Sequence, residues 1–136
     1  MYKLSELLTL KYGKSQRKIE CLDGEYLIYG TGGIIGSSNT YLYDKPSILI
    51  GRKGSISDVL FINKPFWCID TTFYSIINES LVIPRYLYYK LLSIDFMQYN
   101  EGTTVPSLRI ETLNSIKLFI HSKSEQQHIV DIISSS

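Results

Sequence analysis

YLIYGTGGIIGSSNTYLYDKPSILIGRKGSISDVLFINKPFWCIDTTFYSI, residues 26–76, is the stretch that decides the fold class. Its apolar runs are short and rich in β-branched and aromatic residues, which is typical of β-strands. Residues 31–46, between the first two runs, carry glycines and a Ser-Ser-Asn segment that favour tight turns. The predicted strands are residues 25–29, 47–51, 57–62 and 71–77.

Short helices are predicted on both sides of this strand-rich stretch. Residues 3–8 predict one helical turn with its leucines on one face, and residues 11–18 predict a polar loop. Pro84 suits the first turn of a helix, which residues 95–100 are expected to continue or restart. Residues 116–120 are expected to form a last buried strand. The expected fold class is therefore α+β, with one globular, strand-rich domain and a few short helices.

The clearest helix start lies near the C-terminus. Ser122 and Ser124 each precede a Glu or Gln by three residues, which is the spacing of a capping box. Isoleucines then recur at i, i+3 and i+4, and the chain ends after about three and a half turns of 3.6 residues each. We therefore expect one domain over residues 1–121 and a truncated helix over residues 122–136, with its isoleucine stripe facing solvent or a neighbour.

Composition places the chain among globular proteins. It has 136 residues, of which 44% are hydrophobic and 20% charged, as expected of a single domain. No apolar run approaches the roughly 20 residues that span a bilayer, so we expect a cytoplasmic protein with no membrane partner. Cys21 and Cys68 lack CxxC spacing, which is typical of reduced thiols. Cys68 lies in the apolar run FWCID and is expected to be buried and inert.

No motif in the chain predicts catalysis. Gly30, Gly32 and Gly36 miss the GxGxxG spacing of a dinucleotide site by one residue, and GRKGS lacks the spacing of a phosphate loop. His121 and His128 have no cysteine or carboxylate pair at ligand spacing, so no metal site is predicted. We therefore expect no catalytic residues, no metal and no cofactor.

Basic and polar side chains gather in three places despite a net charge of only +1. Residues 11–18 hold four cations with no acid before Glu20, and Arg52 and Lys53 lie in the glycine-bracketed turn GRKG. Residues 100–109, NEGTTVPSLR, offer short hydrogen-bonding side chains. Such side chains contact phosphates and base edges in nucleic acids, but they also fill ordinary solvated loops. From these residues alone both interpretations stay open.

Taken in order, the motifs resemble a known family. The stretch quoted above, together with NEGTTVPSLRIETLNSIKLFI and SEQQHIVDIISSS, is similar to the target recognition domain of a type I restriction-modification specificity subunit. The last segment resembles the start of that family's conserved spacer helix. The resemblance implies a specificity subunit component that performs no chemistry and reads one half of a split double-stranded DNA sequence. With one such domain where the family has two, the chain resembles a half-subunit or an excised fragment.

The resemblance also implies partners and a DNA surface. The implied partners are a methyltransferase subunit, a restriction subunit within the same complex and a second recognition domain. The alternative is a protein-interaction domain that docks a methyltransferase or other chain without contacting DNA. The residues that suit phosphate contacts are Lys14, Arg17, Lys18, Arg52 and Lys53, and those that suit base readout are Ser38, Asn39, Thr40, Thr103, Thr104, Ser107 and Arg109.

Overall fold

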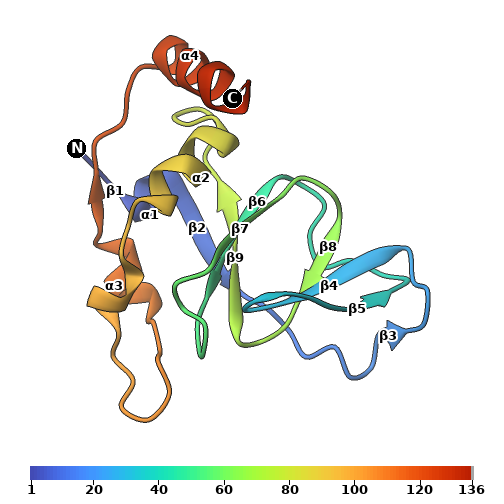
Figure 1. Ribbon diagram of the computed structural model, residues 1–136. Helices are drawn as coiled ribbons and strands as arrows, with labels where there is room; N and C mark the ends of the chain where they lie inside the picture. The colour runs from blue at the N-terminus through green and yellow to red at the C-terminus, as the bar shows by residue number, and fades with distance from the viewer. Residues whose placement is uncertain (136) are drawn as a thin grey trace.

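An antiparallel sheet forms the centre of the computed structural model, which describes residues 1–135 (Figure 1). Short helices and the loops beside them cover one face of this sheet. The main hydrophobic core fills the space between them, with the buried side chains of Ile50, Phe73, Leu87 and Leu113 among its members. The strand order is β2 (Leu8–Tyr12), β9 (Thr72–Ile77), β6 (Ser47–Gly51) and β7 (Val59–Ile62).

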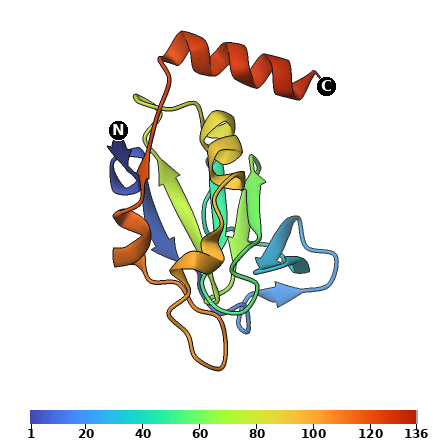
Figure 2. The same cartoon turned by 60° about the vertical axis from the view of Figure 1, so that its left-hand side comes forward.

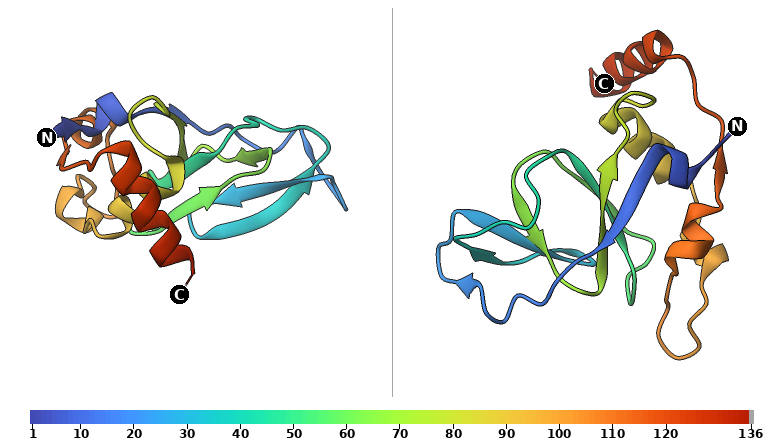
Figure 3. Two further views of the ribbon diagram at one scale, coloured as in Figure 1. Left: turned by 90° about the horizontal axis from the view of Figure 1, so that it is seen from above. Right: turned by 180° about the vertical axis from the view of Figure 1, so that it is seen from behind.

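A second sheet extends to one side of the first, as the views from above and behind show (Figure 3). A smaller core lies around it, in which Leu49 and Phe66 are buried and Tyr43 and Tyr74 are half-buried. The ring centroids of Tyr43 and Tyr74 lie 5.5 Å apart. These tyrosines therefore serve packing. The strand order is β3 (Glu20–Cys21), β5 (Gly33–Ser38), β4 (Tyr26–Gly30) and β8 (Phe66–Cys68), with β4 and β8 parallel.

Strand β5 corrects the prediction of turns over residues 31–46 for its own residues, 33–38. Before β5 only Thr31 and Gly32 turn the chain, because Gly30 pairs with Gly33 in the β4–β5 hairpin, whereas residues 39–46 are irregular with bends, in line with the prediction. Gly33 has a φ of 138°, which L side chains rarely adopt. The strand was missed because Ile34 and Ile35, which are 59% and 47% exposed, do not alternate with buried residues.

The helices are short, as predicted, and most pack against the central sheet. The predicted turn over residues 3–8 and the helix from Pro84 are confirmed. The expected strand over residues 116–120 shrinks to two residues, because its partner β1 is only two residues long and Phe119 is 57% exposed. The remaining elements are β1 (Tyr2–Lys3), α1 (Leu4–Leu7), α2 (Pro84–Leu92), η1 (Phe96–Tyr99), α3 (Ile110–Asn114), β10 (Lys117–Leu118) and α4 (Lys123–Ser134).

Helix α4 is fastened to the domain by a buried glutamine. Its N-cap is Ser122, whose side chain accepts a hydrogen bond from the backbone of Glu125, so the predicted N-cap is confirmed. The Glu125 carboxylate accepts from the Ser122 hydroxyl at 2.9 Å, so the structure shows only the N-cap half of the predicted capping box. Gln126 is fully buried. Its Oε1 accepts from the Ile83 N–H at 2.8 Å, and its Nε2 donates to the carbonyls of Leu81 and His121 at 3.0 and 2.9 Å. The start of the helix is therefore held against the segment that precedes α2.

The far end of α4 carries the isoleucine stripe expected from the sequence. Ile129 packs partly against the main core, whereas Ile132 and Ile133 are 55% and 42% exposed. The exposure of these two side chains agrees with the expectation for this stripe. The buried face of the helix is instead formed by Gln126 and Val130.

The two cysteine thiols are expected to differ in reactivity. Cys68 is buried in the smaller core, and burial raises the pKa of its thiol to about 12. Because the thiolate is the reactive form, Cys68 stays protonated and unreactive at pH 8. Half-buried Cys21 is therefore expected to be alkylated first by iodoacetamide. Peptide mass mapping of the folded chain checks this, with a urea-unfolded sample as the control in which both thiols react. Equal labelling of both thiols in the folded chain contradicts it.

Candidate nucleic-acid interface

Three loops lie at the end of the molecule opposite α4 (Figure 2), and the first of them runs from β2 toward β3, apart from the other two (Figure 1). They follow β2, β6 and η1 and span residues 13–19, 52–58 and 100–109. The second and third loops are joined by backbone hydrogen bonds, from the Gly54 N–H to the carbonyl of Pro106 at 3.0 Å and from the Leu108 N–H to that of Arg52 at 2.8 Å. We call this end the loop face.

Arg52 is held in place at the base of the loop face. Its Nε donates to the carbonyl of Asp70 at 2.8 Å, and its guanidinium lies 5.3 Å from the centre of the Tyr12 ring. Next to it, Lys53 is exposed and forms a β-bridge with Ser107. The turn after β6 therefore offers one fixed and one free cation, both beside the loop of residues 100–109.

The loop after β2 has a fixed start and an exposed basic middle. The Lys14 N–H donates to the carbonyl of Cys68 at 2.9 Å, and the Lys14 carbonyl accepts from the Trp67 indole at 2.8 Å. The side chains of Lys14, Arg17 and Lys18 are exposed. The predicted loop over residues 11–18 is thus shorter than expected, because Lys11 and Tyr12 belong to β2.

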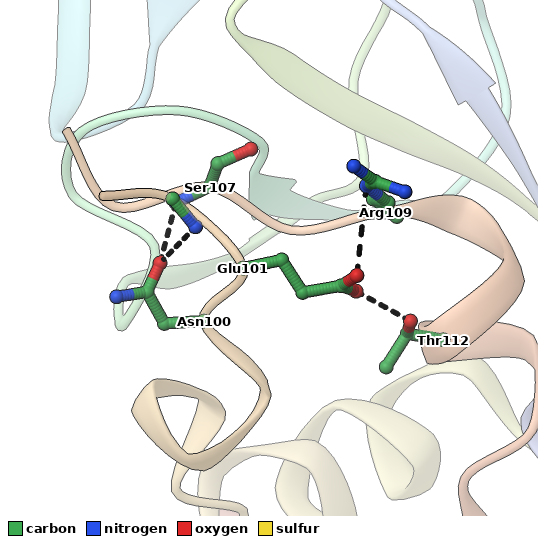
Figure 4. A network of polar contacts seen from close by, with 6 residues as sticks. Asn100, Glu101, Ser107, Arg109 and Thr112 are labelled. Carbon is green, nitrogen blue, oxygen red and sulfur yellow. Dashed lines mark hydrogen bonds and ion pairs between the residues drawn. The ribbon is translucent and has the colours of Figure 1, made fainter. Parts of the chain in front are cut away.

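The loop of residues 100–109 is closed by side chains at its base (Figure 4). Asn100 Oδ1 accepts from the backbone N–H groups of Gly102 and Ser107, both at 2.9 Å. Glu101 Oε2 lies 3.5 Å from Arg109 Nε, and Glu101 Oε1 accepts from the Thr112 hydroxyl at 2.5 Å. The tip of this loop, with Thr103 and Thr104, is exposed.

An open groove of about 450 Å³ lies between the base of this loop and the turn after β6. Two cations and two carboxylates face it, so its charge is balanced, and its remaining lining is mostly polar. An exposed, polar hollow of this kind suits a polar ligand edge better than an apolar small molecule. The lining residues are Tyr12, Arg52, Glu101, Ser107, Leu108, Arg109, Glu111 and Thr112.

Residues 38–40 lie apart from this groove. The β4–β5 turn approaches the loop after β6, since Gly32 lies near the Asp58 carboxylate, and β5 then runs six residues away from it. At about 3.3 Å per residue that is close to 20 Å. Ser38 is fully buried within β5, and its hydroxyl is bonded to the backbone of Thr40. Asn39 and Thr40 are exposed.

The structure thus unites some of the predicted site residues and separates others. Arg52, Lys53, Ser107 and Arg109 come together, whereas residues 38–40 do not join them. Tyr12, Glu101 and Thr112 were missed, because their places at the groove depend on how the loop closes. No local spacing in the sequence signals that closure.

Two further properties concern residues 1–135 as a whole. Within this range, no three His, Cys, Asp or Glu side chains are grouped so that they could hold a metal ion. None of the helices in the same range has the length and apolar character that crossing a membrane requires.

Comparison with known proteins now identifies the family. The sequence model of one protein family, the type I restriction modification DNA specificity domain, matches residues 1–135 of this chain. The chain belongs to this family. A curated relative is the type I restriction enzyme EcoDI specificity subunit of Escherichia coli, which is 27% identical over 131 residues. That match covers 94% of this chain and 29% of the relative.

Solved structures agree with the strand-rich α+β fold. The S subunit of a type I restriction-modification system from M. genitalium superposes with a TM-score of 0.83 at 23% identity, over 98% of this chain and 37% of that one. A structure concerned with complex assembly in the type I R-M system gives a TM-score of 0.78 at 14% identity, with the same coverage. This chain therefore spans about a third of the length of its relatives.

Proposed function

We propose that this chain is a DNA target recognition domain that reads one half of a split sequence for a type I restriction-modification complex. The family match over residues 1–135 carries the proposal. The loop face supports it physically, because exposed cations and short polar side chains project there from fixed backbone. Duplex recognition needs that combination, with cations for the phosphates and directional groups for the base edges.

The loop face divides the proposed work between two sets of side chains. The cations of residues 13–19 and the turn after β6 contact phosphates, and the loop of residues 100–109 reaches base edges. Ser38 is left out because it is buried, whereas Asn39 and Thr40 stand about 20 Å along β5 and would contact a separate part of the duplex. The proposed phosphate contacts are Lys14, Arg17, Lys18, Arg52 and Lys53. The proposed readers are Ser107 and Arg109 at the groove and Thr103 and Thr104 at the tip of the loop.

The rest of the complex is proposed to supply the chemistry. In this arrangement the chain transfers no methyl group and cuts no DNA, and separate methyltransferase and restriction subunits act where it binds. A second recognition domain reads the other half-site. Residues 1–121 form the recognition domain, and residues 122–135 begin a spacer helix whose direction is set by the buried Gln126. Ser136, which the sequence also assigns to this helix, lies outside the described residues.

Salt-dependent DNA binding tests the proposal. The purified chain is used to select a duplex from a random pool. Its affinity for the selected duplex and for a scrambled duplex is then measured at several salt concentrations. We expect Lys14→Ala and Lys53→Ala to lower the affinity for the selected and the scrambled duplex by the same factor. Each should lower the slope of log affinity against log salt by about one, because one phosphate contact is lost.

The control for these variants is Lys117→Ala, which removes the same charge from β10, away from the loop face. It should leave the salt slope unchanged. The absence of salt-dependent, sequence-selective DNA binding contradicts the proposal, and a chain that binds no DNA at all favours the protein-docking alternative. Methyl transfer from S-adenosylmethionine to DNA by the chain alone contradicts the proposed division of labour.

A further inference from the structure

We infer that Glu101 and Thr112 position Arg109 so that the end of its guanidinium reads a guanine in duplex DNA. The inference rests on the proposed function and deepens it, because it names one base type and the residues that prepare its reader. It starts from the Arg109–Glu101 pair at 3.5 Å, the one ion pair between side chains of residues 1–135.

Both oxygens of the Glu101 carboxylate have a partner, and one of them accepts a hydrogen bond. Oε2 faces Arg109 Nε, and Oε1 accepts from the hydroxyl of Thr112, which belongs to α3 (Figure 4). The backbone of Glu101 is also fixed, since its N–H donates to the carbonyl of Ser107 at 2.8 Å. Arg109 is therefore paired with a carboxylate that is itself held by a helix and by a closed loop.

The position of Glu101 beside the guanidinium decides which N–H donors of Arg109 remain free to bind DNA. An arginine carries five N–H donors in a planar fork, and the guanidinium nitrogen that lies 3.5 Å from the carboxylate here is Nε. The two terminal nitrogens remain available, and the side chain is 68% exposed at the groove. A terminal fork held in one orientation matches the O6 and N7 acceptors of guanine in the major groove.

Base readout fits this arginine better than a phosphate contact. A phosphate anchor gains mainly from its net charge, and the carboxylate beside Arg109 cancels most of that charge. Orientation is the property that the pair preserves, and orientation is what a bidentate contact to a base edge requires. Arg52, Lys53 and Lys14 have no carboxylate paired with them among the described residues and are the better phosphate contacts.

Variants that change hydrogen bonding without changing charge test the inference. The measured quantity is the ratio of affinities for the selected duplex and for duplexes in which each G·C pair is replaced in turn by A·T. Thr112→Val removes the hydroxyl that holds Glu101 and should lower this ratio about tenfold at one G·C position, with an unchanged salt slope. Thr112→Ser keeps a hydroxyl and should restore the ratio.

Charge variants separate positioning from simple repulsion of DNA. Glu101→Gln should raise affinity for scrambled DNA, because a negative charge is removed, yet lower the ratio. Glu111→Gln removes a charge from the same groove without touching Arg109 and should raise both affinities alike. In the free chain, NMR relaxation of the Arg109 Nε–H group should show an ordered side chain in wild type and a mobile one in Thr112→Val.

The possible failures are distinguishable. If the wild-type chain has no sequence preference, the proposed function and this inference fall together. If the wild type selects a sequence but Thr112→Val keeps the full ratio, or Glu101→Gln behaves like Glu111→Gln, only the inference falls. Equal melting temperatures of all variants exclude a loss of ratio through unfolding.

Discussion

Replacing Gln126 by methionine is expected to detach α4 from the domain. Methionine fills a similar volume but leaves the Ile83 N–H and the carbonyls of Leu81 and His121 without their partner. Unpaired buried polar groups cost about 1–3 kcal/mol each, so we expect a loss of about 3 kcal/mol of docking free energy. A helix of 12 residues is marginal on its own and should then fray.

Amide hydrogen exchange checks this detachment. Exchange of the backbone amides in α4 should accelerate about 100-fold, in line with 1.4 kcal/mol per factor of ten, while the strands of the central sheet stay protected. Gln127→Met is the matched control, because Gln127 is the exposed neighbour on the same helix and bonds only to Asp131 among the described residues. Unchanged protection of α4 in Gln126→Met would show that the buried amide does not hold the helix.

Replacing Gly13 by alanine is expected to destabilise the whole chain. A Cβ at this position overlaps the carbonyl oxygens of Ile69 and Cys68, and these are backbone atoms that have no rotamer to yield. Relief requires β2 to shift from the segment before β9, which breaks the hydrogen bonds of Gly13 to Thr72 and of Lys14 to Cys68. Overpacking of this kind costs about 3 kcal/mol.

Thermal and urea denaturation measure the effect. A loss of about 3 kcal/mol should lower the melting temperature by about 10 °C in a chain of this size. Gly32→Ala is the control, because only the Asp58 carboxylate lies within 4.0 Å of the added Cβ. A Gly13→Ala variant as stable as Gly32→Ala would mean that the two segments separate freely.

A strand that is a continuous apolar run could be predicted from the sequence. Residues 48–50 are an unbroken apolar run, and β6 has the predicted bounds because it is buried on both faces. The hairpin strand β5 could not be predicted, since its glycines are typical of turns and its isoleucines face solvent. Propensity describes local preference, whereas β5 is fixed by pairing with β4 on one side and β3 on the other.

The buried polar contacts also could not be predicted from the sequence. Ser47 and Ser75 lie in apolar strands and look like ordinary strand residues, yet both are fully buried. The Ser75 hydroxyl accepts from the Ile48 N–H and donates to its carbonyl, both at 2.9 Å, and so takes the place of backbone pairing where β6 and β9 separate. Such a role depends on the distance between two strands, which no local pattern encodes.

The candidate site was predictable in its composition but not in its assembly. The GRKG turn and the loop of residues 100–109 stand out as polar and basic segments, and the structure joins them through Lys53 and Ser107. Ser38 has the same composition signal but lies in a strand, where its hydroxyl serves the backbone. Glu101 gave no signal, since an acidic residue in a DNA-contacting loop is unfavourable until its pairing with Arg109 is seen.

The pairing of distant strands sets an order for folding during synthesis. Leu8 pairs with Ile77, and Tyr2 pairs with Leu118, so the first strands of the chain wait for partners made much later. The β4–β5 hairpin joins neighbouring residues and can form early, because little chain entropy is lost on closing it. The bond between Gly54 and Pro106 closes only after the loop of residues 100–109 has left the ribosome. The groove therefore exists only once nearly the whole domain has been made. A nascent chain that stops before α3 carries the basic side chains but lacks the surface that orders them.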